Sequence, residues 1–292
     1  MNILNILDEI EKVDGEIYER LNPRRKAMQD FYNIGKKISL AALPLAMGSM
    51  FQKAYGQTAT STVTDVLNFA LGLEYLEYNF YNHALAAPVP TPIPAGAATT
   101  AITLIRDHER AHVNLLKSVL KITTPTDPAS DGTKYADYQF EAVLADVFTN
   151  YTSFLKVAVA LEDTGVRAYK GQAGILSQKG DLANNAVLRT ALQIHSVEAR
   201  HAAHLRGMAA AAGLPLKPWI AYAANGNDTG ISLVDANYAG EQNTMQAGVE
   251  INGLGGASQT QAAECFDEAL DGVSVKKIAN AFIKSSSGKQ FT

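Results

Sequence analysis

Four stretches of the chain repeat apolar residues at intervals of three and four, the spacing that places them on one face of an α-helix. These stretches cover approximately residues 62–86, 99–121, 138–171 and 182–212. None of them alternates apolar and polar residues as a β-strand would. Helices of similar length that follow one another along the chain predict an all-α four-helix bundle, which we place at residues 58–213.

The residues before the bundle have a different pattern. Residues 3–21 have helical spacing and predict an amphipathic helix that ends before Pro23. The apolar run 38–51, about fourteen residues long, is short for a membrane span and typical of an export signal. Arg24–Arg25 loosely resembles a twin-arginine signal. Residues 1–57 therefore predict an exported, periplasmic protein with a twin-arginine-like or general signal; the alternative is a cytoplasmic protein that retains this segment as a helix.

The residues after the bundle form a third region, 214–292. It is rich in Gly, Asn and Ala up to about residue 256, and its last part predicts one or two short helices. We expect this extension to wrap the bundle or to contact a partner rather than to fold alone. A homo-oligomer through the faces of the bundle is compatible with such a chain, whereas a closed storage cage would accommodate the extension poorly.

Composition narrows the chemistry that the chain can perform. The 25 Lys and Arg against 29 Asp and Glu are scattered, so the sequence gives no basic footprint for nucleic acid. The single cysteine, Cys265, excludes an intrachain disulfide and a thiolate-rich metal site. Oxygen and nitrogen ligands would therefore have to hold any metal.

Two short motifs on the second and fourth predicted helices provide such ligands. Glu109 and His112 stand three residues apart, and so do Glu198 and His201. Side chains at this spacing point from the same side of a helix. One Glu-x-x-His is a weak signal, but two at corresponding places in a bundle form the pattern of a metal centre.

An internal repeat supplies the remaining carboxylates. Aligning the first helix with the third places Leu73-Glu74 on Leu161-Glu162, and the separation from this glutamate to the motif glutamate is 35 residues in the first half and 36 in the second. Glu77 is a weaker candidate than Glu74, because its counterpart in the second half is Gly165.

Four carboxylates buried in one bundle would repel one another unless cations compensated them. Two divalent ions would balance about four negative charges, and the six side chains suit a pair of five- or six-coordinate irons or manganese ions. The predicted ligands are Glu74, Glu109, His112, Glu162, Glu198 and His201. The alternative is a duplicated hairpin that has lost its metal, or Glu and His pairs that lie on the surface.

These motifs give the chain a resemblance to a known group. Residues 62–213 resemble the ferritin-like superfamily, and "ALEDTGVRAYKG" at 160–171 and "ECFDEAL" at 264–270 are similar to segments of its desiccation-related members. The resemblance implies an antiparallel bundle with one long crossover. It also implies that Glu109 and Glu198 bridge two metals, with Glu74 and His112 completing one coordination sphere and Glu162 and His201 the other.

The resemblance also implies a redox function. We interpret the protein as an oxidoreductase of the ferroxidase type that binds two irons and oxidises Fe(II), or reduces dioxygen or peroxide, in protection against stress. A dinuclear manganese catalase would use the same ligands. A non-enzymatic stress or desiccation protein, with a structural metal or none, is the other alternative.

Several other residues are candidates for contacts with the predicted ligands. Tyr81 and Tyr169 stand seven residues after Glu74 and Glu162, and we expect them either to contact the cluster or to be aromatic core residues. Related sites often place Asp directly before each Glu-x-x-His to bind an imidazole; here these positions are His108, predicted at the surface, and Val197. Asp107 and Asp163 are possible substitutes.

Overall fold

The computed structural model describes residues 61–86, 93–122, 134–177, 185–222, 227, 229–231, 236–246 and 248–292. The predicted amphipathic helix and export signal in residues 1–57 lie outside these ranges, so both stay predictions. Among the helices that are described, none is long and apolar enough to cross a membrane.

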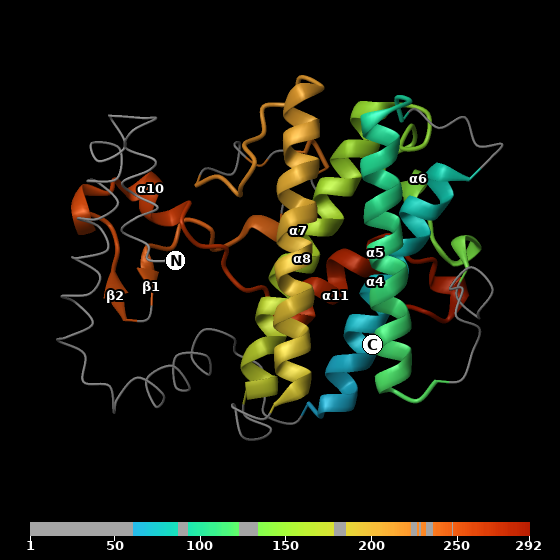
Figure 1. Cartoon of the computed structure of the whole chain (residues 1–292), viewed down its shortest axis with the longest axis horizontal. Helices are drawn as coiled ribbons and strands as arrows, with labels where there is room; N and C mark the ends of the chain where they lie inside the picture. Colours follow the sequence, from blue (N-terminus) through green and yellow to red (C-terminus); the bar gives the residue numbers. More distant parts are fainter. Residues whose placement is uncertain are drawn as a thin grey trace, which may run out of the picture.

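Four long helices lie side by side and form the body of the molecule (Figure 1). They are α4 (Val63–Leu85), α5 (Ala97–Val119), α7 (Tyr151–Ser177) and α8 (Ala186–Ala211). The main helix contacts are those of α4 with α5 and of α7 with α8, and α4 also packs on α7. The predicted all-α bundle is therefore confirmed.

The connection from α5 to α7 is the long crossover. Its described part carries the 3₁₀-helix η2 (Tyr135–Asp137) and the short α6 (Phe140–Val143), and the long third helix begins only at Tyr151. The predicted start near residue 138 was wrong because Asn150 caps α7. Its side-chain oxygen accepts a hydrogen bond from the backbone N–H of Ser153 at 3.1 Å, which satisfies one of the free donors of the first turn.

Aromatic side chains join the two hairpins. Phe80 of α4 stacks on Phe154 of α7 with ring centroids 5.1 Å apart, and Phe140 of α6 lies 5.1 Å from Phe80. All three are fully buried. Contacts between aromatic rings stabilise a fold by more than the burial of their apolar area alone. This aromatic cluster therefore fixes the crossover against the bundle.

The C-terminal extension contains short elements around the bundle. In chain order they are η4 (Ala236–Tyr238), β1 (Met245–Gln246), β2 (Val249–Glu250), η5 (Leu254–Gly256), α10 (Gln259–Ala263), α11 (Gly272–Ala281) and η6 (Ser285–Ser287). The two strands pair antiparallel in a small hairpin, which hydrophobic periodicity did not predict. The hairpin and α10 lie to one side of the bundle, whereas α11 packs on α7 (Figure 1).

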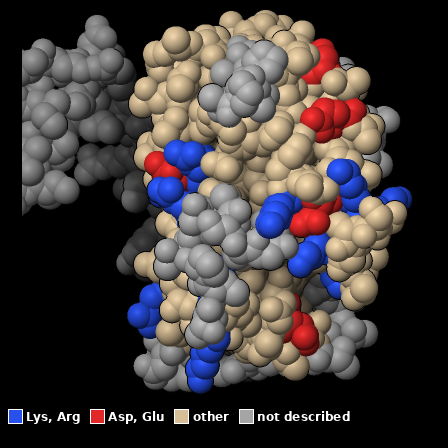
Figure 2. Space-filling model, turned by 90° about the vertical axis from the view of Figure 1, so that its right-hand side faces the viewer, with Lys and Arg blue, Asp and Glu red and all other residues tan. Residues whose placement is uncertain are grey.

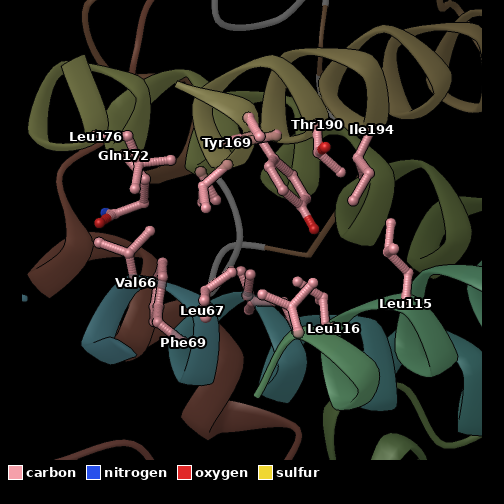
Figure 3. A pocket seen from close by; sticks show the side chains of 17 residues that line it. Val66, Leu67, Phe69, Leu115, Leu116, Tyr169, Gln172, Leu176, Thr190 and Ile194 are labelled. Atoms are coloured by element: carbon pink, nitrogen blue, oxygen red, sulfur yellow. The ribbon is translucent and has the colours of Figure 1, made fainter. Parts of the chain in front are cut away.

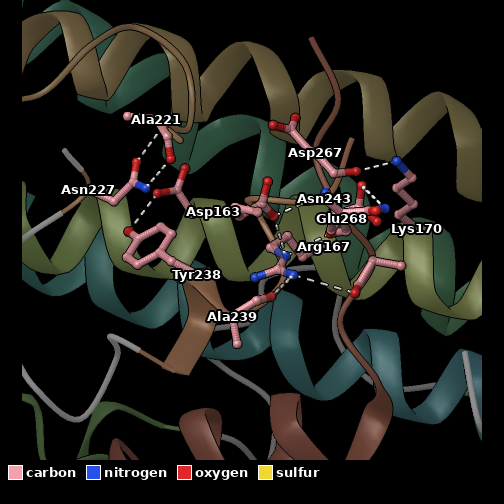
Figure 4. Close-up of polar contacts among 12 residues, drawn as sticks. Asp163, Arg167, Lys170, Ala221, Asn227, Tyr238, Ala239, Asn243, Asp267 and Glu268 are labelled. Atoms are coloured by element: carbon pink, nitrogen blue, oxygen red, sulfur yellow. Dashed lines mark hydrogen bonds and ion pairs between the residues drawn. The ribbon is translucent and has the colours of Figure 1, made fainter. Parts of the chain in front are cut away.

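Buried ion pairs hold the extension to α7 and α8. Arg206 of α8 pairs with Asp163 of α7 at 2.6 Å. The Tyr238 hydroxyl donates to the same carboxylate at 2.8 Å (Figure 4). Arg167 of α7 pairs with Glu241 at 2.9 Å. Both arginines are only 1% exposed. Removing one partner of a buried pair would leave an uncompensated charge, so these contacts make the extension an integral part of the fold.

Gly171 marks a close approach rather than a helix end. The sequence predicted that the third helix stops near this residue, yet α7 continues to Ser177. A Cβ atom at Gly171 would lie 2.2 Å from the carbonyl oxygen of Leu270. The Leu270 backbone N–H also donates to the carbonyl of Arg167 at 3.2 Å. The glycine therefore allows the extension to lie directly on the helix.

One face of the molecule shows how charge is distributed. In Figure 2, Lys and Arg side chains lie among Asp and Glu side chains and a larger uncharged area. Opposite charges that alternate in this way do not create the single-sign field that attracts a nucleic-acid backbone.

We expect Gly171→Ala to lower the free energy of unfolding by about 1–3 kcal/mol, because the added methyl group forces the Leu270 backbone away from α7. Denaturant unfolding measures this change. Gly207→Ala is the matched control, since a Cβ at Gly207 of α8 meets nothing within 4 Å. The control should gain about 0.5–1 kcal/mol from helix propensity. Equal effects at the two glycines would contradict the close approach.

Candidate metal centre

The four long helices bring the six predicted ligands together near their midpoints. Two glutamates come from α4 and α7, and a Glu-x-x-His pair comes from each of α5 and α8. The four glutamates are fully buried, and the two histidines are 8% and 5% exposed. The six residues are Glu74, Glu109, His112, Glu162, Glu198 and His201.

Their side-chain atoms form two overlapping groups. One group contains Glu74 and His112, the other contains Glu162 and His201, and both include Glu109 and Glu198. Within each group one potential ligand atom from every residue lies within 4.8 Å of the others. Two four-residue groups that share two carboxylates have the arrangement of a dinuclear site with bridging carboxylates.

The Nδ1 atom of His112 shows how closely the first group converges. It lies 3.1 Å from Glu74, 3.1 Å from Glu109 and 3.2 Å from Glu198. A ring nitrogen carries at most one proton and cannot donate to three carboxylates with good geometry. The convergence therefore fits groups that surround a common cation.

His201 occupies the corresponding place in the second group. Its Nδ1 lies 2.9 Å from Glu109, 3.2 Å from Glu162 and 3.8 Å from Glu198. The internal repeat seen in the sequence thus has a counterpart in the geometry of the site.

Unpaired oxygen atoms test whether these residues fit a metal. In the described part of the chain, Glu109 Oε1 and both carboxylate oxygens of Glu198 are buried without a hydrogen-bond donor. The 2.9 Å approach of His201 Nδ1 to Glu109 Oε1 lacks the alignment of a hydrogen bond. Buried carboxylate oxygens without donors are costly. Since the unpaired atoms belong to the two carboxylates shared by both groups, the residues fit a pair of cations.

The titration behaviour follows from the same crowding. Burial raises the pKa of Glu109 well above its usual range, and nearby Glu198 and Glu162 raise it further. Burial also raises the pKa of Glu162 to about 7. Burial opposes ionisation of Glu198 as well, but the imidazoles of His112 and His201 outweigh it and lower the pKa of this carboxyl. Protons and metal cations would therefore compete for the same carboxylate oxygens and imidazole nitrogens of the cluster.

Comparison with known protein families gives an independent result. Residues 62–211 match the ferritin-like domain. The chain belongs to this family. No curated protein and no solved structure matches it. The matched range contains all four long helices and all six residues of the cluster, so the ferritin-like domain and the buried Glu and His groups together are compatible with a dinuclear metal site. Membership of the desiccation-related group stays a prediction.

Two tyrosines of the ferritin-like domain support the glutamates across the bundle. Tyr81 of α4 donates to Glu162 of α7 at 2.6 Å, and Tyr169 of α7 donates to Glu74 of α4. Burial raises the pKa of both phenols well above the usual value, and the neighbouring glutamates add to this effect. Each tyrosine therefore keeps its proton and fixes one carboxylate of the opposite hairpin.

His108 contacts the cluster, whereas the sequence predicted it at the surface. Its Nδ1 lies 2.9 Å from Nε2 of His201, the ring nitrogen that faces away from the carboxylates. Burial, and then the nearby His201, lower the pKa of His108, which favours a neutral ring that accepts the proton of His201. Such a contact orients an imidazole for metal binding.

The two aspartates proposed as substitutes do not have this role. Asp107 pairs with Arg106 at 2.7 Å and with Arg110 at 3.1 Å, and Asp163 is bound to Arg206. The cluster is therefore asymmetric in its outer contacts, because Val197, the counterpart of His108, offers no polar group.

Glu77 is a fifth carboxylate beside the cluster. It is only 3% exposed, and burial, with Glu198 as the next cause, raises its pKa well above the usual range. A Cβ at Gly165 would lie 3.0 Å from Glu77 Oε1 and 3.4 Å from Glu198 Oε2. The absence of a glutamate at position 165 therefore leaves room for Glu77. In the sequence the same glycine made Glu77 a weaker candidate than Glu74, because it showed only that the repeat has no second glutamate there.

We expect His108→Ala to weaken metal binding by about 10- to 100-fold, because His201 loses the partner that orients its ring. Competition with a chelator of known affinity measures the loss, and His108→Asp should restore part of it by supplying another acceptor. His204→Ala is the control, since His204 is an exposed histidine on α8, the helix that carries His201. Equal affinities for His108→Ala and His204→Ala would show that the contact does not matter.

Proposed function

We propose that the protein binds two iron ions and oxidises Fe(II), or reduces dioxygen or peroxide, in protection against stress. The observation that carries this proposal is the pair of overlapping groups that share Glu109 and Glu198 and leave their buried oxygens without donors. Structural ion pairs do not explain such an arrangement, because no described Lys or Arg makes a salt bridge with these two carboxylates.

The proposed ligands divide into shared and separate sets. Glu109 and Glu198 would bridge the two ions, Glu74 and His112 would complete one coordination sphere, and Glu162 and His201 would complete the other. Carboxylate and imidazole ligands suit both iron and manganese. Four carboxylates balance the charge of two divalent ions, so metal binding would relieve the repulsion within the cluster.

A bound pair of redox-active ions would supply the electrons for the reduction of dioxygen or peroxide. The protein's own residues prepare the place for this chemistry. Burial keeps bulk water away from the carboxylates. Tyr81 and Tyr169 each hold a proton on the phenol oxygen and position one glutamate, and His108 orients His201.

Export and self-association belong to the same proposal. We propose that the protein is exported by the signal in residues 1–57 and associates, if it oligomerises, through the faces of the bundle. Metal ions and dioxygen or peroxide are the proposed partners. An N-terminal sequence of the protein isolated from the cell envelope fraction would show whether the segment is removed.

Metal-dependent turnover tests the function. We expect protein loaded with Fe(II) without oxygen to oxidise the iron rapidly when dioxygen or peroxide is added. The Glu109→Ala and Glu198→Ala double variant should fall to the rate of free Fe(II) in buffer, because it lacks both shared carboxylates. Glu250→Ala is the matched control, since Glu250 is an exposed glutamate in the extension. Iron absorbance and oxygen consumption provide the measurement.

The same assay separates the alternatives. Rapid disproportionation of peroxide by the manganese-loaded protein, with inert iron, would identify a manganese catalase. If neither metal supported turnover, the protein would be a non-enzymatic stress bundle and the redox proposal would be wrong.

A further inference from the structure

A cavity of about 220 Å³ lies between the two helical hairpins (Figure 3). All four long helices contribute to its wall, and nearly all of the lining side chains are apolar. Its lining includes Ala70, Leu73, Leu116, Tyr169, Ala191 and Ile194. The cavity is separate from the polar cluster but shares helices with it.

Helical spacing places one end of the cavity next to the cluster. Ala70 stands four residues before Glu74, Leu116 four residues after His112, and Ile194 four residues before Glu198. Residues four apart lie one helical turn from each other on the same face. Three cavity residues on three helices are thus each one turn from a predicted ligand.

Tyr169 is the direct link between the cavity and the cluster. Its side chain lines the cavity (Figure 3). Its hydroxyl donates to Glu74 of the cluster. Gln172 and Thr190 are the other polar residues of the wall. A molecule in the cavity would therefore meet an apolar surface on most sides and the ring of Tyr169 near the metal ligands.

The size and lining of the cavity determine what it can hold. Water needs two to four polar partners, and an apolar cavity of about 150 Å³ remains dry and binds benzene or xenon. The present cavity is larger, and its rim carries Leu115 and Val119, which are 39% and 44% exposed. Because the rim is apolar like the wall, an apolar molecule makes favourable contacts both at the entrance and inside the cavity.

We propose that this cavity binds a small apolar organic molecule, of the size of an aromatic ring or a short aliphatic chain, one helical turn from the metal centre. The role of this molecule as a substrate rests on the proposed function, because it is the class of molecule that the metal centre would act on. The binding itself requires only the cavity, so it can be measured without metal.

Benzene is the probe that tests this proposal. We expect benzene to raise the melting temperature of the metal-free full chain in a saturable way. Ala191→Phe should weaken benzene binding at least about 10-fold by filling the cavity, since an added ring takes most of a site of this size. Ala210→Phe is the matched control on the same helix, because Ala210 is exposed and lies outside the cavity.

Xenon provides a readout that does not need a variant. Crystals of the wild-type protein under xenon pressure should show a xenon atom between Ala70 and Ile194. No saturable benzene binding together with no xenon in the cavity would overturn the inference, and so would unchanged benzene affinity in a folded Ala191→Phe variant.

A metal count on the same protein after loading with Fe(II) or Mn(II) separates this inference from the proposed function. Benzene binding by a protein that takes up no metal supports the cavity site and contradicts the metal centre. Two metals per chain with no benzene or xenon binding would contradict the cavity site alone.

Discussion

The mutual repulsion of four buried carboxylates is the constraint on which the site depends. Glu74, Glu109, Glu162 and Glu198 are fully buried in the middle of the bundle. No described Lys or Arg pairs with them, and two imidazoles and two phenols lie against their oxygens. Desolvation and like charge both oppose this arrangement. A pair of divalent cations would remove both costs together.

The rest of the bundle keeps competing positive charges away from the cluster. Asp163, directly after Glu162, is neutralised by Arg206, and Arg167 is occupied by Glu241 of the extension. The two buried arginines are therefore bound to other partners and leave the carboxylates of the cluster without a cationic side chain. This division also ties stability to function, because the contacts that hold the extension use residues of the helices that carry the ligands.

Local patterns predicted the fold class and the composition of the cluster. Spacing of three residues within a helix, together with the repeat that aligns Glu74 with Glu162, identified side chains that the structure brings together. Features that depend on contacts between distant segments were not predictable in this way. The role of Gly171 depends on the approach of residue 270, and the role of His108 depends on which ring of α8 lies opposite it. Glu77 required knowing that Gly165 leaves space across the bundle.

The location and number of metals test the central claim most directly. Crystals of protein loaded with Fe(II) or Mn(II) should be measured at the absorption edge of the metal, where anomalous scattering identifies the element. We expect two peaks per chain, one beside His112 and one beside His201, with Glu109 and Glu198 between them. A chain with no peak among these residues, at saturating metal and neutral pH, would contradict it.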